Sequence, residues 1–119
     1  MSAKRFENLK VWEKAHQFVL KIYQLTGTFP KHELFGLTSQ MRRAAISIPA
    51  NIAEGFVKRT IPDKIRFFNI SQGSVEETRY FLRLTNDLGY GDTLDLTNDL
   101  IEISKMLNSY IKTIRNASI

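Results

Sequence analysis

Apolar residues along this chain recur at intervals of three and four positions, the spacing of one face of an α-helix, and not at the interval of two that is typical of a strand. Glycine and proline interrupt the pattern in three stretches, at residues 27–36, 55–62 and 89–91. The pattern therefore predicts four helices, over about residues 9–26, 38–59, 61–88 and 93–115.

The connections between these helices are short, so successive helices are expected to run antiparallel. The chain has 119 residues, of which 43% are hydrophobic and 24% are charged, and these values fit one globular domain with one core. We therefore predict an all-α fold, an antiparallel up-down-up-down four-helix bundle that spans residues 1–119.

The second predicted helix is apolar on two opposed sides. One side carries the stripe expected to face the core: Leu37, Met41, Ala44, Ile48 and Ile52. At about 100° per residue, a second strip lies on nearly the opposite side: Ile46, Ala50, Ala53 and Val57. Because a four-helix bundle has one interior, we expect this second strip to be an oligomer interface with another copy of the chain. The alternative is an ordinary exposed face, since alanine and single aliphatic residues are common on helix surfaces.

A polar stripe follows the same helix and consists of Arg43, Ser47, Asn51, Glu54 and Lys58. Pro49 lies beside the stripe and has no amide hydrogen, so the carbonyl of Ala45 loses its helical partner. Ser47 or Asn51 could donate a hydrogen bond to that carbonyl, and Glu54 could pair with Lys58. Together with Gly55, these residues favour a structural hydrogen-bonded motif, and a ligand contact is the alternative.

The formal net charge is +5, and the predicted topology distributes it unevenly. The start of the first helix, the second connection and the end of the fourth helix should meet at one end of the bundle. The basic residues at that end are Lys4, Arg5, Lys10, Lys58, Arg59, Lys64, Arg66, Lys112 and Arg115. Only Glu7 and Asp63 oppose them, so nine positive minus two negative charges leave +7. At the opposite end, residues 27–43 and 87–99, three basic and five acidic residues leave −2.

A strongly positive end is suited to phosphate backbones. We expect the nucleic-acid contacts to come from Lys58, Arg59, Lys64 and Arg66, with support from Lys4, Arg5, Lys112 and Arg115. Contacts to phosphates carry little sequence information, so binding should be largely independent of sequence. The alternative is a solvated end whose charge only aids solubility.

No catalytic, metal or cofactor motif is evident in the sequence. Glu13 and His16 have the E-x-x-H spacing of di-iron bundles, but that motif needs a second pair, and the other histidine, His32, has no glutamate three residues before it. No glycine-rich phosphate loop occurs. We therefore predict no catalytic residue, no metal and no cofactor, and a protein that is not an enzyme.

Three further features bear on the compartment. Cysteine is absent, residues 1–10 are polar and charged, and no apolar run approaches the roughly 18 residues needed to cross a membrane. These features predict a cytoplasmic protein with no signal peptide and no membrane contact.

Several segments resemble one bacterial family. Residues 35–45 read FGLTSQMRRAA, residues 47–55 read SIPANIAEG, and residues 6–12 read FENLKVW. Further matching positions are Gly73, Ser74, Glu77 and the run from Asp87 to Tyr90. Over nearly its whole length, the chain is similar to the four-helix-bundle proteins encoded in intervening sequences of 23S ribosomal RNA genes.

This resemblance implies an antiparallel bundle that assembles as a homopentameric, barrel-like ring. It also implies kinship with the accessory variability protein of diversity-generating retroelements, a basic pentamer that binds nucleic acid and a reverse transcriptase. We therefore expect a non-catalytic, homo-oligomeric accessory protein that binds structured RNA or an RNA–protein complex through its basic end. The expected partners are further copies of the chain, RNA or DNA, and a reverse transcriptase or ribosomal component. The alternative is a protein-interaction scaffold that docks a polymerase or another protein without useful nucleic-acid affinity.

Overall fold

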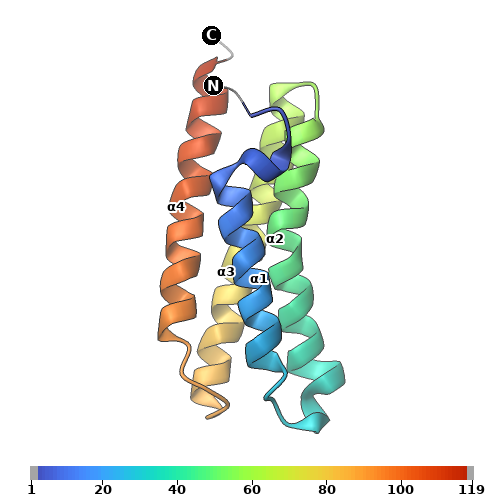
Figure 1. The fold of residues 1–119 in the computed structure, drawn as a ribbon, viewed down its shortest axis with the longest axis vertical. Coiled ribbons are helices and arrows are strands. Elements are labelled where there is room, and N and C mark those ends of the chain that lie inside the picture. The colour runs from blue at the N-terminus through green and yellow to red at the C-terminus, as the bar shows by residue number, and fades with distance from the viewer. Residues whose placement is uncertain (1–2, 118–119) are drawn as a thin grey trace.

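The computed structural model describes residues 3–117, which form a bundle of helices (Figure 1). The four long helices are α1 (Lys10–Thr26), α2 (Ser39–Val57), α3 (Ile61–Asp87) and α4 (Leu94–Ala117). Short helical turns occur before α1 and between α1 and α2: the 3-10 helices η1 (Phe6–Asn8) and η2 (Lys31–Glu33), and the π-helix η3 (Leu34–Thr38). Across residues 3–117, no helix combines the length and the apolar character that crossing a membrane requires.

Successive helices run in opposite directions, and each helix packs against two others around the bundle (Figure 1). The molecule measures 50 × 23 × 20 Å along its principal axes. The start of α1, the α2–α3 connection and the end of α4 lie together at the upper end in Figure 1. The α1–α2 and α3–α4 connections lie at the lower end. This arrangement places the two oppositely charged groups of residues at opposite ends of one bundle.

The core contains the predicted stripe of the second helical segment. All five of its members are buried: Leu37, Met41, Ala44, Ile48 and Ile52. The facing side of α3 is more polar than an ordinary core face, because it buries Ser71, Ser74, Thr78 and Thr85. Every buried side-chain nitrogen and oxygen among the described residues has a hydrogen-bond partner. The α2–α3 packing therefore combines close apolar contact with satisfied hydroxyl groups.

The connection between α2 and α3 is longer than the sequence predicts. α2 ends at Val57 and not at residue 59, because Lys58 is extended, with φ −68° and ψ 150°. Thr60 is also extended, and its Oγ1 accepts a hydrogen bond from the amide of Asp63 at 3.3 Å. Since a helix N-cap needs an extended backbone, capping α3 keeps residues 58–60 out of both helices.

The entry to α2 contains a feature that periodicity does not predict. In η3 the backbone of Gly36 is non-helical, with φ −113° and ψ −112°. The Oε1 atom of Glu33 accepts a hydrogen bond from the amide of Leu37 at 3.4 Å, which holds the turn. The side chain of Phe35 is left 92% exposed.

The polar groups beside Pro49 bond differently from our expectation. The Nδ2 of Asn51 donates to the carbonyl oxygen and to the Oγ of Ser47, both at 2.8 Å. The hydroxyl of Ser74 on α3 donates to the Ser47 Oγ at 2.7 Å. The prediction that Ser47 or Asn51 serves the carbonyl of Ala45 is therefore wrong, because Asn51 bonds to Ser47 within α2 and Ser47 accepts from Ser74 of α3. These hydrogen bonds are consistent with the structural role that the sequence predicts for Ser47 and Asn51.

Gly55 permits the closest approach between α2 and α3. A Cβ atom at this position would lie 2.5 Å from Cε1 and 2.8 Å from Cδ1 of Phe68, whose ring is fully buried. No side chain fits there unless the ring moves. Gly55 thus lets the end of α2 rest directly on an aromatic core residue.

Candidate nucleic-acid interface

The structure brings the predicted basic residues to one end of the bundle. Lys58 and Arg59 lie in the α2–α3 connection, and Lys64 and Arg66 follow in the first turns of α3. The remaining members come from the segment before η1 and the last turns of α4: Lys4, Arg5, Lys112 and Arg115. All four of these outlying residues are exposed.

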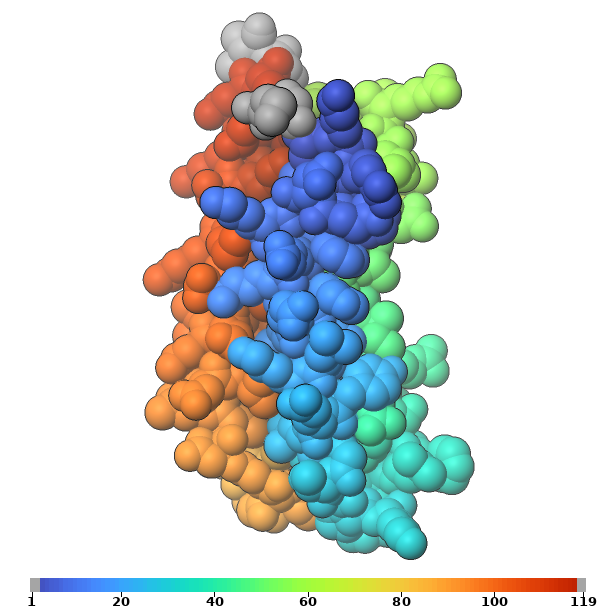
Figure 2. All heavy atoms as spheres, viewed as in Figure 1, coloured from blue at the N-terminus to red at the C-terminus, as the bar shows by residue number. Residues whose placement is uncertain are grey.

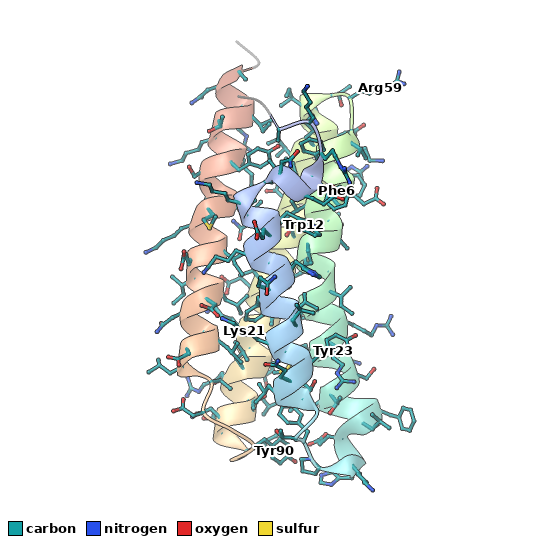
Figure 3. All side chains as sticks on the ribbon, viewed as in Figure 1. Phe6, Trp12, Lys21, Tyr23, Arg59 and Tyr90 are labelled. Carbon is teal, nitrogen blue, oxygen red and sulfur yellow. The ribbon has the colours of Figure 1, made fainter. Side chains whose placement is uncertain are left out.

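Arg59 is the most accessible cation of the α2–α3 connection. Its side chain is exposed and extends away from the bundle (Figure 3). It forms no hydrogen bond or ion pair with any residue from 3 to 117. An arginine in this setting keeps all of its guanidinium donors available for a phosphate.

Phe67 holds two further cations next to Arg59. The Nζ of Lys58 lies 4.9 Å from the centre of the Phe67 ring, and the Cζ of Arg66 lies 4.5 Å from the same centre. Cation–π contacts of this length restrain a charged group without neutralising it. Phe67 follows Lys58 by nine residues, and no spacing rule links these two positions in the sequence.

Both of these cations also have a carboxylate nearby. Lys58 lies 3.9 Å from Glu54, the pair predicted from their spacing, and Arg66 lies 3.9 Å from Asp63. These distances are at the outer limit of an ion pair, and the side chains are partly or largely exposed. Such pairs contribute little in water, so a phosphate could replace either carboxylate at small cost.

Lys64 makes a contact that the sequence does not predict. Its Nζ donates to the carbonyl oxygen of Phe56 at 2.6 Å and approaches that of Gly55 at 3.5 Å. These carbonyls belong to the last turn of α2, where the helix leaves acceptors unpaired. Burial lowers the pKa of Lys64 below its ordinary value. Lys64 therefore caps α2, while its contact with nucleic acid stays a prediction, as it does for Lys58, Arg59 and Arg66.

The second apolar strip of α2 is largely exposed in the single chain. Ile46 is 41% exposed and Val57 is 63% exposed, Ala50 is exposed as well, and Ala53 is half-buried. Part of the strip forms one wall of a groove of about 310 Å³ between α1 and α2. Figure 2 looks onto α1, which separates this groove on its α2 side from a second groove on its α4 side.

The opposite wall of the α1–α2 groove is aromatic. Phe6 packs edge-on against Trp12 with ring centres 5.1 Å apart, and His16 stacks on Trp12 at 5.1 Å with an interplanar angle of 7°. Helical spacing does not link Phe6, which lies in η1, to Trp12 and His16 of α1. The aromatic and aliphatic side chains that line the groove are therefore not covered by another helix among the described residues.

The E-x-x-H pair of α1 has no metal-binding neighbourhood. The His16 ring packs on Trp12, and Glu13 is exposed. Within residues 3–117, no three histidine, aspartate or glutamate side chains lie close enough together to hold a metal ion.

The structure thus defines a class: an antiparallel four-helix bundle with a cationic end and an uncovered apolar face on α2. The model of the 23S rRNA-intervening sequence protein family matches residues 7–109, and the chain belongs to that family. The family resemblance predicted from the sequence is confirmed.

A solved structure agrees with this assignment. The chain is similar to a protein of unknown function from the S23 ribosomal protein family of Bacteroides thetaiotaomicron, whose crystal structure matches with a TM-score of 0.79 and 31% sequence identity. The match covers 86% of this chain and 98% of that chain. A search of curated proteins finds no match.

Proposed function

We propose that this protein is a homo-oligomeric accessory protein that binds nucleic acid through the basic end of its bundle and does not catalyse a reaction. Its ligand is structured RNA or an RNA–protein complex. The observation that carries the proposal is the cation group at the α2–α3 connection, where Arg59 is unpaired among the described residues and Phe67 holds Lys58 and Arg66 beside it.

The mechanism is electrostatic. Lysine and arginine side chains that contact phosphates release condensed counterions, so affinity falls steeply as salt rises. The α2–α3 connection offers lysine and arginine side chains that can donate hydrogen bonds to phosphate oxygens. Binding should therefore depend on the shape and backbone of the RNA and not on its sequence.

We propose further that copies of the chain assemble side by side as a pentameric, barrel-like ring, as in the accessory variability protein of diversity-generating retroelements. The strip of Ile46, Ala50, Ala53 and Val57 supports this proposal, because an exposed apolar helix face next to an aromatic groove is suited to a second subunit. In a ring of parallel subunits, the basic ends would form one large positive surface.

A protein-interaction scaffold is the second candidate function. The side chain of Phe35, 92% exposed at the end opposite the cation group, favours it. A fully exposed phenylalanine is unusual on a monomer surface, and aromatic residues are enriched at protein interfaces. In this function the ring docks a polymerase or another protein, and its basic end meets an acidic protein surface.

The first test is binding to a structured ribosomal RNA fragment at about 50 and 200 mM salt, with the mass of the protein in solution measured in parallel. The proposal predicts an assembly of five chains of 13.7 kDa each and, for about six phosphate contacts, a loss of roughly 10³ in affinity between the two salt concentrations. An intact assembly that does not bind at low salt would support the scaffold function instead.

A further inference from the structure

A row of ion pairs joins α1 to α4 along one side of the bundle. Lys21 lies 2.9 Å from Asp99, and Lys14 lies 3.2 Å from Glu102. Figure 3 shows Lys21 on the side of α1 that faces α4. Each pair matches one lysine of α1 with one carboxylate of α4, so this part of the helix contact is electrically balanced.

The pairing of lysine with carboxylate stops one helical turn closer to the basic end of the bundle. The next lysine of α1 is Lys10, and the next charged residue of α4 is Lys105 rather than a carboxylate. Both are exposed, and neither forms a hydrogen bond or an ion pair with any residue between 3 and 117. Two positive charges therefore border this part of the α1–α4 contact without an anion.

An apolar groove lies at this position. It has a volume of about 480 Å³ and combines the start of α1 with the last turns of α4. The residues lining it are Leu9, Lys10, Val11, Lys105, Met106, Ser109, Tyr110 and Thr113. The Tyr110 ring forms part of the floor and packs on the buried Phe68 with ring centres 5.2 Å apart. Burial raises the pKa of Tyr110, so its phenol stays neutral and adds no negative charge to the groove.

We propose that this α1–α4 groove binds an amphipathic organic anion, a free fatty acid, with its alkyl chain on the apolar floor and its carboxylate between Lys10 and Lys105. The volume falls within the range of small-molecule sites, and long apolar surface bordered by charge of one sign matches such a ligand. The carboxylate supplies the negative charge that Asp99 and Glu102 supply in the preceding pairs.

The groove fits an alkyl chain better than a nucleobase. The accessible surface of the groove is mainly apolar and includes Leu9, Val11 and Met106. Base binding sites use exposed aromatic faces, whereas the Tyr110 ring is half-buried against the core. The inference is thus separate from the proposed RNA-binding cations at the α2–α3 connection.

The methionines provide a direct readout. Met106 lines the groove, while Met41 is fully buried in the core. Protein labelled with ¹³C at the methionine methyl groups is titrated with laurate below its micelle concentration. The inference predicts a saturable shift of the Met106 signal and an unchanged Met41 signal. A shift of both signals together would mean general unfolding or detergent action and would overturn it.

Three comparisons identify the occupant. Dodecyltrimethylammonium, which has the same tail length but a positive head, should bind about tenfold more weakly than laurate. The double variant Lys10→Gln with Lys105→Gln should also lose about tenfold in laurate affinity, whereas Lys31→Gln, at an exposed position outside the groove, should retain it. Equal binding of both surfactants, or equal loss in both variants, would overturn the inference.

The remaining comparison uses a synthetic acidic amphipathic helix of leucine and glutamate. If this peptide shifts the Met106 signal at lower concentration than laurate does, the groove is a protein-docking site and the fatty-acid assignment is wrong. None of these measurements uses RNA or depends on the oligomer, so their failure leaves the proposed function untouched.

Discussion

The Nζ atom of Lys64, in the first turn of α3, lies 2.6 Å from the carbonyl oxygen of Phe56 in the last turn of α2. The contact closes the connection that carries Lys58 and Arg59, because it joins the last turn of α2 to the first turn of α3. Lys64, which the sequence predicts as a nucleic-acid contact, thus also caps the end of α2.

Replacement of Lys64 by methionine should lower the free energy of unfolding by about 1–2 kcal/mol, because a charged hydrogen bond to helix carbonyls is lost while the aliphatic volume is kept. Urea unfolding followed by circular dichroism measures the change. Lys31→Met is the control, since Lys31 is exposed and should change stability by less than about 0.5 kcal/mol. If Lys64→Met and the wild type have the same free energy of unfolding, Lys64 does not stabilise the end of α2.

Gly55→Ala should destabilise the bundle by about 1–3 kcal/mol, because the added methyl would overlap the Phe68 ring. Gly73 provides a matched control within the adjacent helix. A Cβ at Gly73 meets no atom within 4 Å, so Gly73→Ala should stabilise by about 0.5–1 kcal/mol through helix propensity. Thermal unfolding of both variants distinguishes the two effects, and a neutral Gly55→Ala would contradict the close approach.

Tyr90 ties the two connections at the lower end of the bundle, since its hydroxyl donates to Oε2 of Glu33 at 2.8 Å (Figure 3). This bond raises the pKa of Tyr90 above its ordinary value, because it favours the neutral phenol. Its contribution to stability is thus fully present below the unfolded phenol pKa of about 10, and it is lost as pH rises through the higher folded pKa.

Tyr90→Phe should therefore be less stable than the wild type at pH 7, and the difference should shrink as the pH rises above about 10. Unfolding midpoints measured at pH 7, 9, 10 and 11 give the comparison. Tyr80→Phe is the control, because Tyr80 is exposed and donates no hydrogen bond to a described residue. A stability difference between wild type and Tyr90→Phe that is constant with pH would argue against the Glu33 contact.

Ala50→Asp should dissociate the proposed ring, because it would bury an unpaired carboxylate in the subunit contact. Ala50 is exposed in the single chain, so the helix itself should tolerate the change. Light scattering should report 13.7 kDa for the variant, with an unchanged helical circular dichroism signal. Gln17→Asp, at an exposed position of α1, should leave the assembly intact. An assembled Ala50→Asp protein would move the interface to another face.

Regular spacing made the helices and the α2 core stripe predictable. Met41, Ile48 and Ile52 are buried because the helical repeat alone places them on one side. The separation of charge between the ends also followed from short connections, which force the second connection to lie beside the chain ends. These features depend on local periodicity and on topology, both of which a sequence contains.

The contacts that refine the site depend on atoms far apart in the chain. Tyr90 and Glu33 are 57 residues apart, and Phe67 meets Lys58 only because α3 turns back along α2. The sequence predicts Lys64 only as one more basic residue of the surface, because no spacing rule relates it to the end of α2. The π-helical entry to α2 was missed for the same reason, because it depends on a side-chain bond from Glu33 and on the backbone of Gly36.

The central claim is tested most directly by charge reversal at the α2–α3 connection. Lys58→Glu with Arg59→Glu should weaken binding to a structured ribosomal RNA fragment by at least about tenfold and lower the salt slope by about 2 per subunit in contact. Lys31→Glu with Arg43→Glu makes the same change in net charge at the opposite end and should keep the wild-type affinity. If the first variant binds as the wild type does, or if both lose affinity equally, the basic end is not the binding site.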